Sequence, residues 1–536
     1  MADFGLLNWT ILVAYIVSNL VLGAVLSKRV TTANDFYLGR RTTPWWAIGV
    51  SVIATYVSAL SFLGGPAWSY KESLAVMAIH LNYPIVVFVV ITVFLPFFFN
   101  SGVASIYDYM EQRFGSTSRL VISSVFLISQ TLTSAAILYA TALVIEFITG
   151  VNVNLCIVIV TIVALIYTMM GGITAVIWTD VIQAGVLFVG AFIIMFALIS
   201  EMPAPLMEVL ADLKAQGKTN ALELSFDFTR EATIWSGVIA MSIFHITVYG
   251  ANQMMVQRTL AAKNIGDAKK SFLLMGFVAF FIYFLFFVLG ILLYSYYGGK
   301  TFENDNTIIL TSAANYGLPG LMGIIAAAIV AASMSTLDSS FNSLSTISTI
   351  DFYQKYFRKD ASPEHYLKVS RAFTIFWAVL IIVPAILYAS LEGSVLQTLS
   401  KIGSYFVGAK LSMYGLGFFS KDTTEKGLLV GVVAGFIMIW VLATQTDIAW
   451  PWYCLFGGGV NIIVSLVASL IIDGRQEEWS EYTITGQKRM FKEKGLPEKD
   501  GNWYVVPGKV DSVSYLLLVF FVGTLLFLYA FNALIG

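Results

Sequence analysis

The sequence predicts an all-α, polytopic membrane protein with about fourteen transmembrane helices. Hydrophobic residues make up 58% of its 536 residues and charged residues only 12%, whereas soluble domains carry roughly 25% charged residues. The mean hydropathy is +0.80. Apolar runs close to the roughly 20 residues that cross a bilayer recur almost to the C-terminus. Unbroken runs of this length differ from the short alternating strands of a membrane β-barrel.

Fourteen apolar runs are expected to span the membrane. Their approximate bounds are 8–27, 45–70, 78–99, 119–149, 153–170, 178–200, 233–258, 271–297, 317–349, 370–390, 395–418, 427–445, 451–472 and 513–534. The first run has no basic segment before it and no clear small-residue cleavage site, so it is expected to be a retained helix. Two loops are long: 201–231, which carries a helical pattern, and 473–511, which is polar.

The basic residues divide the loops into two sets. With the N-terminus outside, 24 of the 31 Lys and Arg, Arg258 among them, fall in the inner loops. Two more lie within a span, Lys401 and Lys410, and only five fall outside: Lys71, Lys214, Lys218, Arg230 and Lys300. Because inner loops are enriched in Lys and Arg, this division predicts that both termini lie outside. A gain or loss of one helix would abolish it.

The sequence gives little support to several other classes of protein. It carries no P-loop, no paired-histidine metal motif and no long basic tail for nucleic acid. Cys156 and Cys454 lie in apolar runs, so no disulfide framework is indicated. No nucleophile–base pair stands out, which argues against an enzyme. The lipid bilayer is an expected partner, whereas a net charge of −1 says nothing about partner proteins, which stay unknown.

A polar stretch at 323–353 follows the apolar start of one expected span. Ser335, Asp338, Ser339 and Asn342 are spaced by three and four residues, so they share one helix face. An aspartate at the centre of a membrane helix costs roughly 2.5–3.5 kcal/mol on insertion scales, and it normally faces a cavity, a partner or an ion. Hydroxyl and carboxylate oxygens suit a hard cation, so this face predicts a cation site. The alternative is that the hydroxyls bond to their own helix and allow close packing.

Two expected spans carry polar groups and helix breakers at mid-depth. The span 45–70 contains Thr55, Ser58 and Ser61, followed by Gly64-Gly65-Pro66, and the span 233–258 contains His245, Thr247, Gly250 and Asn252. Glycine and proline interrupt helices and release backbone carbonyls. Two interrupted spans in corresponding halves predict an inverted-repeat transporter whose binding site lies where the breaks meet. Tolerated kinks are the alternative.

Further ionisable residues lie in or beside the spans. Asp180 is placed at the cytoplasmic start of the sixth span, where a solvated aspartate is the alternative to a site residue. Lys401 and Lys410 are free to snorkel, to pair with a carboxylate or to hold an anionic solute. His80 and His245 fit either packing or hydrogen bonding to a polar ligand.

Four segments in order carry a resemblance to a known family: DFYLGRRTTPWWAIG (35–49), GGITAVIWTDVIQ (171–183), GANQMMVQRTLAAKNIGDAKK (250–270) and SMSTLDSSFNSLSTISTIDFY (333–353). In these the chain resembles the solute:sodium symporters, which include glucose, galactose, proline and sialic acid symporters. The resemblance implies a LeuT-like core of two inverted five-helix repeats. One transporter domain would then cover 1–536, with a leading helix in 1–44, repeats at 45–200 and 233–418, and accessory helices in 427–536.

The resemblance also implies ion sites. One Na⁺ would be bound by the carbonyls of Ala54, Val57 and Ala332 and the hydroxyls of Ser335 and Thr336. A second cation site, found in some members, would correspond to Asp180, Ser335, Asp338 and Ser339. Members with that site commonly have serine or threonine at the position of Asp338. Since paired carboxylates raise one another's pKa, both a second sodium and a proton stay open.

The expected solute site combines the broken spans with the family's pocket positions. The candidates are Ser58, Ser61, His80, His245, Tyr249, Asn252, Ser400 and Lys401. Tyr249 is preferred to Val248 as an inner aromatic gate, and Thr133 stands where sialic acid symporters have an arginine. Histidines and hydroxyls favour a sugar or polyol, imported with sodium across a bacterial inner membrane by alternating access. A sodium- or proton-coupled carboxylate symporter, a non-transporting sensor of the same fold and a channel are the alternatives.

Overall fold

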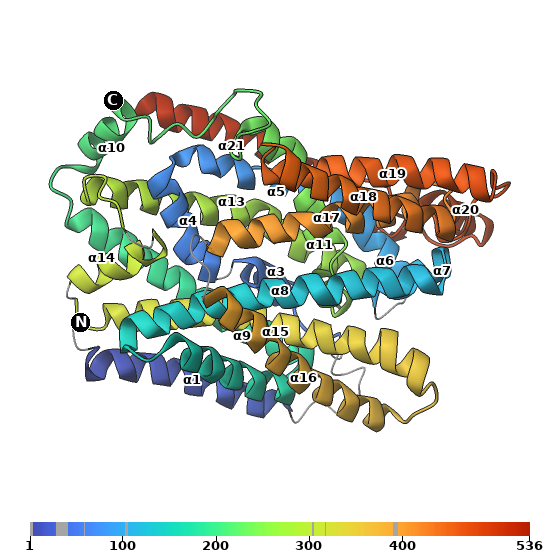
Figure 1. Ribbon diagram of the computed structural model, residues 1–536, viewed down its shortest axis with the longest axis horizontal. Helices are drawn as coiled ribbons and strands as arrows, with labels where there is room; N and C mark the ends of the chain where they lie inside the picture. The colour runs from blue at the N-terminus through green and yellow to red at the C-terminus, as the bar shows by residue number, and fades with distance from the viewer. Residues whose placement is uncertain are drawn as a thin grey trace.

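The protein is a bundle of long helices that run roughly along one direction (Figure 1). Its structure, a computed structural model, describes residues 4–27, 41–57, 59–101, 105–302, 305–316, 318–389 and 395–535. Within these ranges the only sheet is a short hairpin of β1 (Lys499–Asp500) and β2 (Trp503–Tyr504), with Lys499 opposite Tyr504. The all-α prediction is therefore confirmed.

The first half of the chain supplies the elements from α1 to α10. In chain order they are α1 (Gly5–Ser27), α3 (Trp45–Tyr56), α4 (Ala59–Lys71), η1 (Leu74–His80), α5 (Tyr83–Val89), η2 (Val90–Phe94), α6 (Leu95–Ser101), α7 (Ile106–Arg113), α8 (Ser116–Thr149), α9 (Val153–Ser200) and α10 (Leu206–Ala215).

The second half begins with another interrupted helix. Its elements are η3 (Ser236–Ala240), α11 (Met241–Gly250), α12 (Gln253–Leu260), α13 (Ile265–Tyr296), η4 (Asp305–Thr307), α14 (Ile308–Tyr316), α15 (Leu321–Ile347), η5 (Ser348–Phe357), α16 (Pro363–Ala389), α17 (Val395–Phe419), α18 (Glu425–Gln445), η6 (Trp450–Trp452), α19 (Tyr453–Ile472), α20 (Ile484–Glu493), η7 (Ser512–Ser514) and α21 (Tyr515–Leu534).

The two ends of the bundle differ in the elements that cover them. Both termini, α10 and α14 lie at one end, and α7 and α20 lie at the other (Figure 1). An even number of crossings requires the termini to share a side. Among the described residues ten helices are long and apolar enough to cross a membrane, and three shorter apolar helices accompany them. The count of fourteen remains a prediction.

The expected spans 153–170 and 178–200 are carried by one assigned helix, α9. It holds 48 residues, which at about 1.5 Å per residue is roughly 72 Å of helix, more than twice the roughly 30 Å hydrocarbon core. Its two apolar parts are Val153–Ile166 and Ile173–Ser200. These two parts match the two expected spans in position, no loop is assigned between them, and the two separate crossings stay a prediction.

The first broken helix is confirmed, but its break lies earlier than expected. α3 ends at Tyr56, and the next residue, Val57, has φ −78° and ψ 84°, outside the helical region. α4 then runs without interruption through Pro66. The prediction that Gly64-Gly65-Pro66 interrupts this span is wrong.

Close packing explains why the glycine–proline segment stays helical. α4 packs along α13, and a Cβ added to Gly290 of α13 would lie 2.2 Å from the carbonyl oxygen of Pro66. A Cβ on Gly65 would meet Phe286 of α13 at 3.4 Å. The glycines thus allow two helix backbones to approach, and the neighbouring helix holds α4 in place despite its proline.

The second broken helix has its interruption where the sequence placed it. α11 ends at Gly250, and Ala251 leaves the helical region with φ −125° and ψ 31°. Asn252 then caps α12, its side-chain Oδ1 accepting a hydrogen bond of 3.0 Å from the backbone N–H of Met254. Asparagine is a favoured N-cap because it satisfies a free N–H of the first turn.

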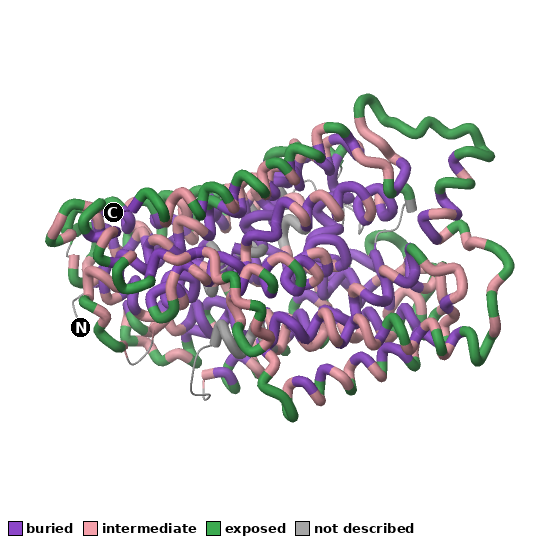
Figure 2. The backbone as a smooth tube through the Cα atoms, turned by 90° about the horizontal axis from the view of Figure 1, so that it is seen from above, coloured by how far each residue is buried: buried purple, intermediate pink, exposed green. Residues whose placement is uncertain are grey.

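The outer faces of the bundle are apolar and the interior carries the polar groups. On α1 the side chains of Val13, Val17, Val21 and Val25 are each about half exposed and form one stripe at intervals of four residues, as expected for a helix that faces lipid. Buried backbone lies mainly in the interior of the bundle (Figure 2). The polar residues of α15 between Ser333 and Thr346 whose exposure is described are all buried.

Candidate functional site

A central cavity of about 210 Å³ lies between the two broken helices. Its walls come from α3, α4, η1, α8, α11, α12, α13, α15, α17 and η6. The residues used below are Thr55, Ser61, Trp68, His80, Ser129, Gln130, Thr133, His245, Val248, Asn252, Thr336, Lys410 and Trp450, all of which line it. Ligand pockets commonly measure roughly 300–1,000 Å³, so this cavity suits a small solute.

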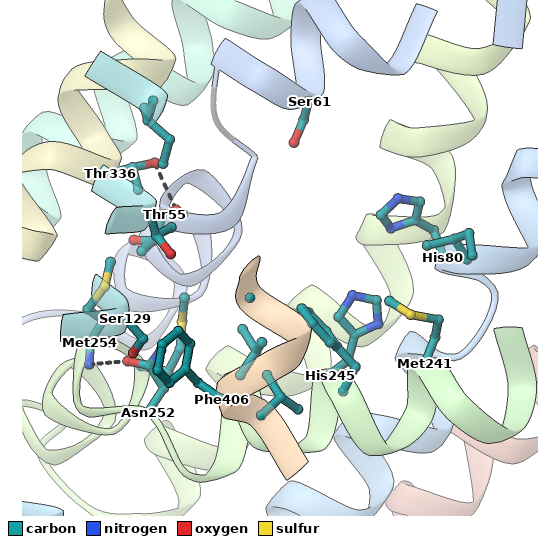
Figure 3. Close-up of a pocket in the computed structure, with 18 of the residues that line it drawn as sticks. Thr55, Ser61, His80, Ser129, Met241, His245, Asn252, Met254, Thr336 and Phe406 are labelled. Carbon is teal, nitrogen blue, oxygen red and sulfur yellow. Dashed lines mark hydrogen bonds between the residues drawn. The ribbon is translucent and has the colours of Figure 1, made fainter. Parts of the chain in front are cut away.

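One wall of the cavity joins α3 to α15. The Thr336 hydroxyl donates a hydrogen bond of 2.9 Å to the carbonyl oxygen of Thr55, as the dashed line in Figure 3 shows. Thr55 lies in the last turn of α3, where carbonyls lack a partner within the helix. Both side chains are buried. The break in α3 thus supplies oxygen atoms directly beside the polar face of α15.

The residues predicted to bind sodium gather in part at this junction. Ala54 and Val57 lie within two residues of Thr55, and both are buried, as is Thr336. The side chains of Ala332 and Ser335 lie outside the described part of the structure, although the backbone of α15 continues through both. The five-oxygen site itself stays a prediction.

The polar face of α15 divides into two kinds of side chain. Ser333, Ser340, Ser345 and Thr346 donate to carbonyls of their own helix, which is the packing alternative. Other side chains of this face reach neighbouring helices: Thr336 bonds to α3, and Asp338 accepts from Thr168 of α9 at 2.9 Å. The packing alternative therefore holds for the first four residues, and the cation site on this face stays a prediction.

Asp180 forms a buried ion pair that the sequence analysis missed. Arg258 Nη2 lies 3.1 Å from Asp180 Oδ2, and both side chains are fully buried. Arg258 also donates to Ser51 Oγ at 2.8 Å and to the hydroxyl of Ser339, and Ser51 donates to Asp180. The solvated alternative for Asp180 and the inner-loop placement of Arg258 are both wrong.

The burial of Arg258 has a simple geometrical cause. It lies six residues after Asn252, where the broken helix resumes, which corresponds to only about 9 Å of helix. If the break lies at the middle of a roughly 30 Å hydrocarbon core, Arg258 remains inside that core. This signal was present in the sequence, but it required the break and the charge to be considered together.

The opposite wall of the cavity is aromatic and carries both histidines (Figure 3). His80 Nδ1 lies 2.9 Å from Tyr83 Oη, and the His80 ring stacks on Tyr283 with centroids 3.6 Å apart. His245 Nδ1 lies 2.6 Å from Asn82 Oδ1. The two histidines therefore have fixed orientations, and Ser61 lies near them on the cavity wall.

The remaining predicted solute residues differ in where they lie. Asn252 lines the cavity, but Tyr249 does not; its neighbour Val248 does. Tyr249 instead packs near Tyr83 and Phe272, since adjacent helical residues point about 100° apart. Val248 therefore lines the cavity in place of Tyr249, and the role of Tyr249 as an inner gate stays a prediction. Ser58, and the side chains of Ser400 and Lys401, lie outside what the structure describes.

Lys410 is a further cavity residue, whose role the sequence left open. It lies on α17 and is only 6% exposed, so it does not snorkel. Its Nζ donates a hydrogen bond of 2.7 Å to Ser129 Oγ of α8. Beside Ser129, Gln130 Nε2 donates to Ser340 Oγ at 2.9 Å, which connects this wall to α15.

Comparison with known proteins identifies the family. The family model described as "Sodium:solute symporter family" matches residues 36–435. The chain belongs to the sodium:solute symporter family. It is 29% identical over 488 residues to the sodium/sialic acid symporter of Proteus mirabilis, covering 88% of this chain and 97% of that protein. It is 31% identical over 438 residues to the sodium/glucose cotransporter of Vibrio parahaemolyticus, covering 75% and 78%.

A solved structure of a related symporter confirms the fold of this family member. It is the substrate-bound, outward-open state of a Na⁺-coupled sialic acid symporter, with 28% identity and a TM-score of 0.82, and the match covers 89% of this chain and 100% of that chain. The LeuT-like core is therefore confirmed. The chain is a multi-pass, sodium-coupled symporter of a small solute, and its relatives are transporters rather than enzymes.

Proposed function

We propose that this symporter imports a small hydroxylated solute of the sugar-acid type together with sodium, by alternating access. The observation that carries the proposal is the central cavity between the two broken helices, with the Thr336–Thr55 contact on one wall and His80 and His245 on the other. This is where inverted-repeat transporters bind solute and ion.

Sodium binds first, at the junction of α3 and α15. Its ligands are the carbonyls of Ala54, Val57 and Ala332 and the hydroxyls of Ser335 and Thr336. Because these groups belong to two helices, the ion ties α3 to α15 and stabilises the arrangement that binds solute. By linkage, the bound solute must raise sodium affinity by the same factor. Entry of one positive charge across 100 mV supplies about 2.3 kcal/mol for accumulation.

The solute class follows from the polar groups of the cavity together with the relatives. Ser61, His80, His245 and Asn252 offer donors and acceptors for hydroxyl groups. Relatives at similar identity carry either sialic acid or glucose. A sialic acid combines a hydroxylated ring with a carboxylate, so we favour it over the neutral sugar or polyol expected from the sequence.

The position of Arg258 determines whether a second cation can bind. In the described arrangement the Arg258 guanidinium already supplies positive charge between Asp180 and Ser339. A second cation bound by Asp180, Asp338 and Ser339 therefore requires Arg258 to withdraw. This makes one sodium ion per cycle the simplest stoichiometry.

The basic inner loops favour an orientation with both termini outside, in the inner membrane of a bacterium. A channel is disfavoured because the chain belongs to a family of coupled carriers. A sensor would bind solute but would not accumulate it.

Uptake into proteoliposomes tests the proposal. Labelled sialic acid, glucose, a polyol and short carboxylates are offered under an inward sodium gradient, a proton gradient, or neither. Concentrative uptake of sialic acid under sodium alone is expected. Uptake that is the same under a sodium gradient, a proton gradient and no gradient would contradict symport. Uptake driven only by the proton gradient would contradict the sodium site.

A further inference from the structure

Lys410 is a buried lysine on the wall of the central cavity. Its side chain is 6% exposed, and the contacts of Nζ are the 2.7 Å hydrogen bond to Ser129 Oγ and the Phe126 ring, whose centroid lies 5.7 Å away. Among the described residues no carboxylate lies within 4.0 Å of this ammonium. An ammonium has three donors, so the one hydrogen bond leaves two.

A buried, incompletely paired ammonium is costly unless something completes its shell. Other buried basic side chains have fuller sets of partners: Arg258 pairs with Asp180 and Lys269 with Asp511. Lys218 donates to three backbone carbonyls. Lys410 differs from them in facing a cavity wide enough for a solute. The missing counter-charge is therefore expected to arrive from the cavity, as part of a ligand.

We propose that Lys410 and Ser129 form the subsite that binds the carboxylate of the transported solute. This rests on the proposed function, and it assigns the anion to the wall formed by α8 and α17. Lys410 donates directly to the carboxylate, and the Ser129 hydroxyl, which accepts from Nζ at 2.7 Å and donates to the carbonyl of Phe126 at 3.2 Å, orients the Lys410 side chain toward the solute. The hydroxylated part of the solute then extends toward His80 and His245, across the cavity (Figure 3).

The same wall connects the anion subsite to the sodium junction. Next to Ser129, Gln130 donates to Ser340, and Ser340 donates at 2.8 Å to the backbone carbonyl of Thr336. A bound solute that shifts Lys410 and Ser129 is therefore expected to shift the turn of α15 that carries the Thr336 hydroxyl. This gives a physical route by which a bound carboxylate raises sodium affinity.

The test compares an acid with its neutral form at the binding step. Trp68 and Trp450 line the cavity, so tryptophan fluorescence reports binding in the purified, full-length protein without requiring transport. The probes are a sialic acid, its methyl ester and acetate, each titrated in saturating sodium. The wild type is expected to prefer the acid to the ester by roughly tenfold or more, as a charge-assisted contact requires.

Variants separate the charge of Lys410 from its packing. In Lys410→Met the preference for the acid is expected to fall below about threefold, whereas Lys410→Arg retains most of it. Ser129→Ala is expected to reduce the preference in part, which keeps the test decisive if Lys410→Met does not fold. Ser412→Ala is the control, since Ser412 is buried on the same helix and bonds only to carbonyls of that helix.

Two results would overturn the assignment. One is an acid preference in Lys410→Met equal to that of the wild type, and the other is a wild type that binds ester and acid alike. Failure of the proposed function has a different signature, because binding with acid preference but without sodium-driven uptake indicates a sensor that still uses Lys410.

Discussion

Replacing Thr336 with valine is the most informative single change, because it removes an oxygen while keeping the shape of the side chain. The hydroxyl proton of Thr336 is directed at the carbonyl of Thr55, 2.9 Å away. A hydroxyl has two acceptor lone pairs besides its proton, and these are the electrons with which the Thr336 oxygen would coordinate a cation. Thr336→Val therefore loses the helix-to-helix hydrogen bond of this structure and, in the sodium-bound state, also the ion contact.

The expected change in sodium affinity follows from the loss of the ion contact. A hydrogen bond to a charged group contributes about 1.5–3 kcal/mol, and we take the ion–hydroxyl contact to be similar. That energy corresponds to a rise of roughly 10–150-fold in the sodium concentration for half-maximal uptake, at 1.4 kcal/mol for each factor of ten. At saturating sodium, the half-saturating solute concentration is expected to stay near the wild-type value.

The assay is initial-rate uptake in proteoliposomes over a range of sodium concentrations. Thr336→Ser keeps the hydroxyl and is expected to resemble the wild type. Ser345→Ala is the matched control, because Ser345 is buried on the same helix and bonds only to the carbonyl of Asn342. A sodium half-saturation in Thr336→Val within about threefold of the wild type would refute the role of this hydroxyl.

Two further predictions concern stability. Arg258→Met leaves Asp180 buried without its ion-pair partner, so it is expected to destabilise the folded protein by about 3–5 kcal/mol in detergent unfolding, and Arg258→Met combined with Asp180→Asn is expected to recover part of the loss. Gly290→Ala places a methyl group 2.2 Å from the carbonyl oxygen of Pro66 and is expected to cost about 1–3 kcal/mol. Gly523→Ala, whose added Cβ meets nothing within 4 Å, is expected to leave the unfolding midpoint unchanged.

Much of the fold could be predicted because the membrane restricts what a chain can do. A segment that crosses hydrocarbon must be helical and apolar on its lipid face, so composition and run length predicted long apolar helices, of which the described residues hold ten. The second break was predicted correctly because Asn252 both follows a glycine and caps the new helix. These features depend on a residue and its immediate neighbours in the chain, so the sequence alone is enough to predict them.

The errors arose where a distant part of the chain decides the local structure. Gly64-Gly65-Pro66 has the composition of a helix breaker, yet α13 packs against it and keeps α4 helical. Arg258 looks like a loop residue until Asp180, 78 residues earlier, is placed beside it. The cavity wall made by Lys410 and Ser129 joins residues 281 positions apart, so only the assembled fold could reveal it.

The central claim is that sodium at the α3–α15 junction and solute in the cavity stabilise one another. The most direct measurement is equilibrium binding of sialic acid to the purified protein with and without sodium, together with sodium binding with and without the solute. The account predicts that each ligand raises the affinity of the other by the same factor, and that Thr336→Val reduces this factor. Solute affinity that is independent of sodium would contradict it.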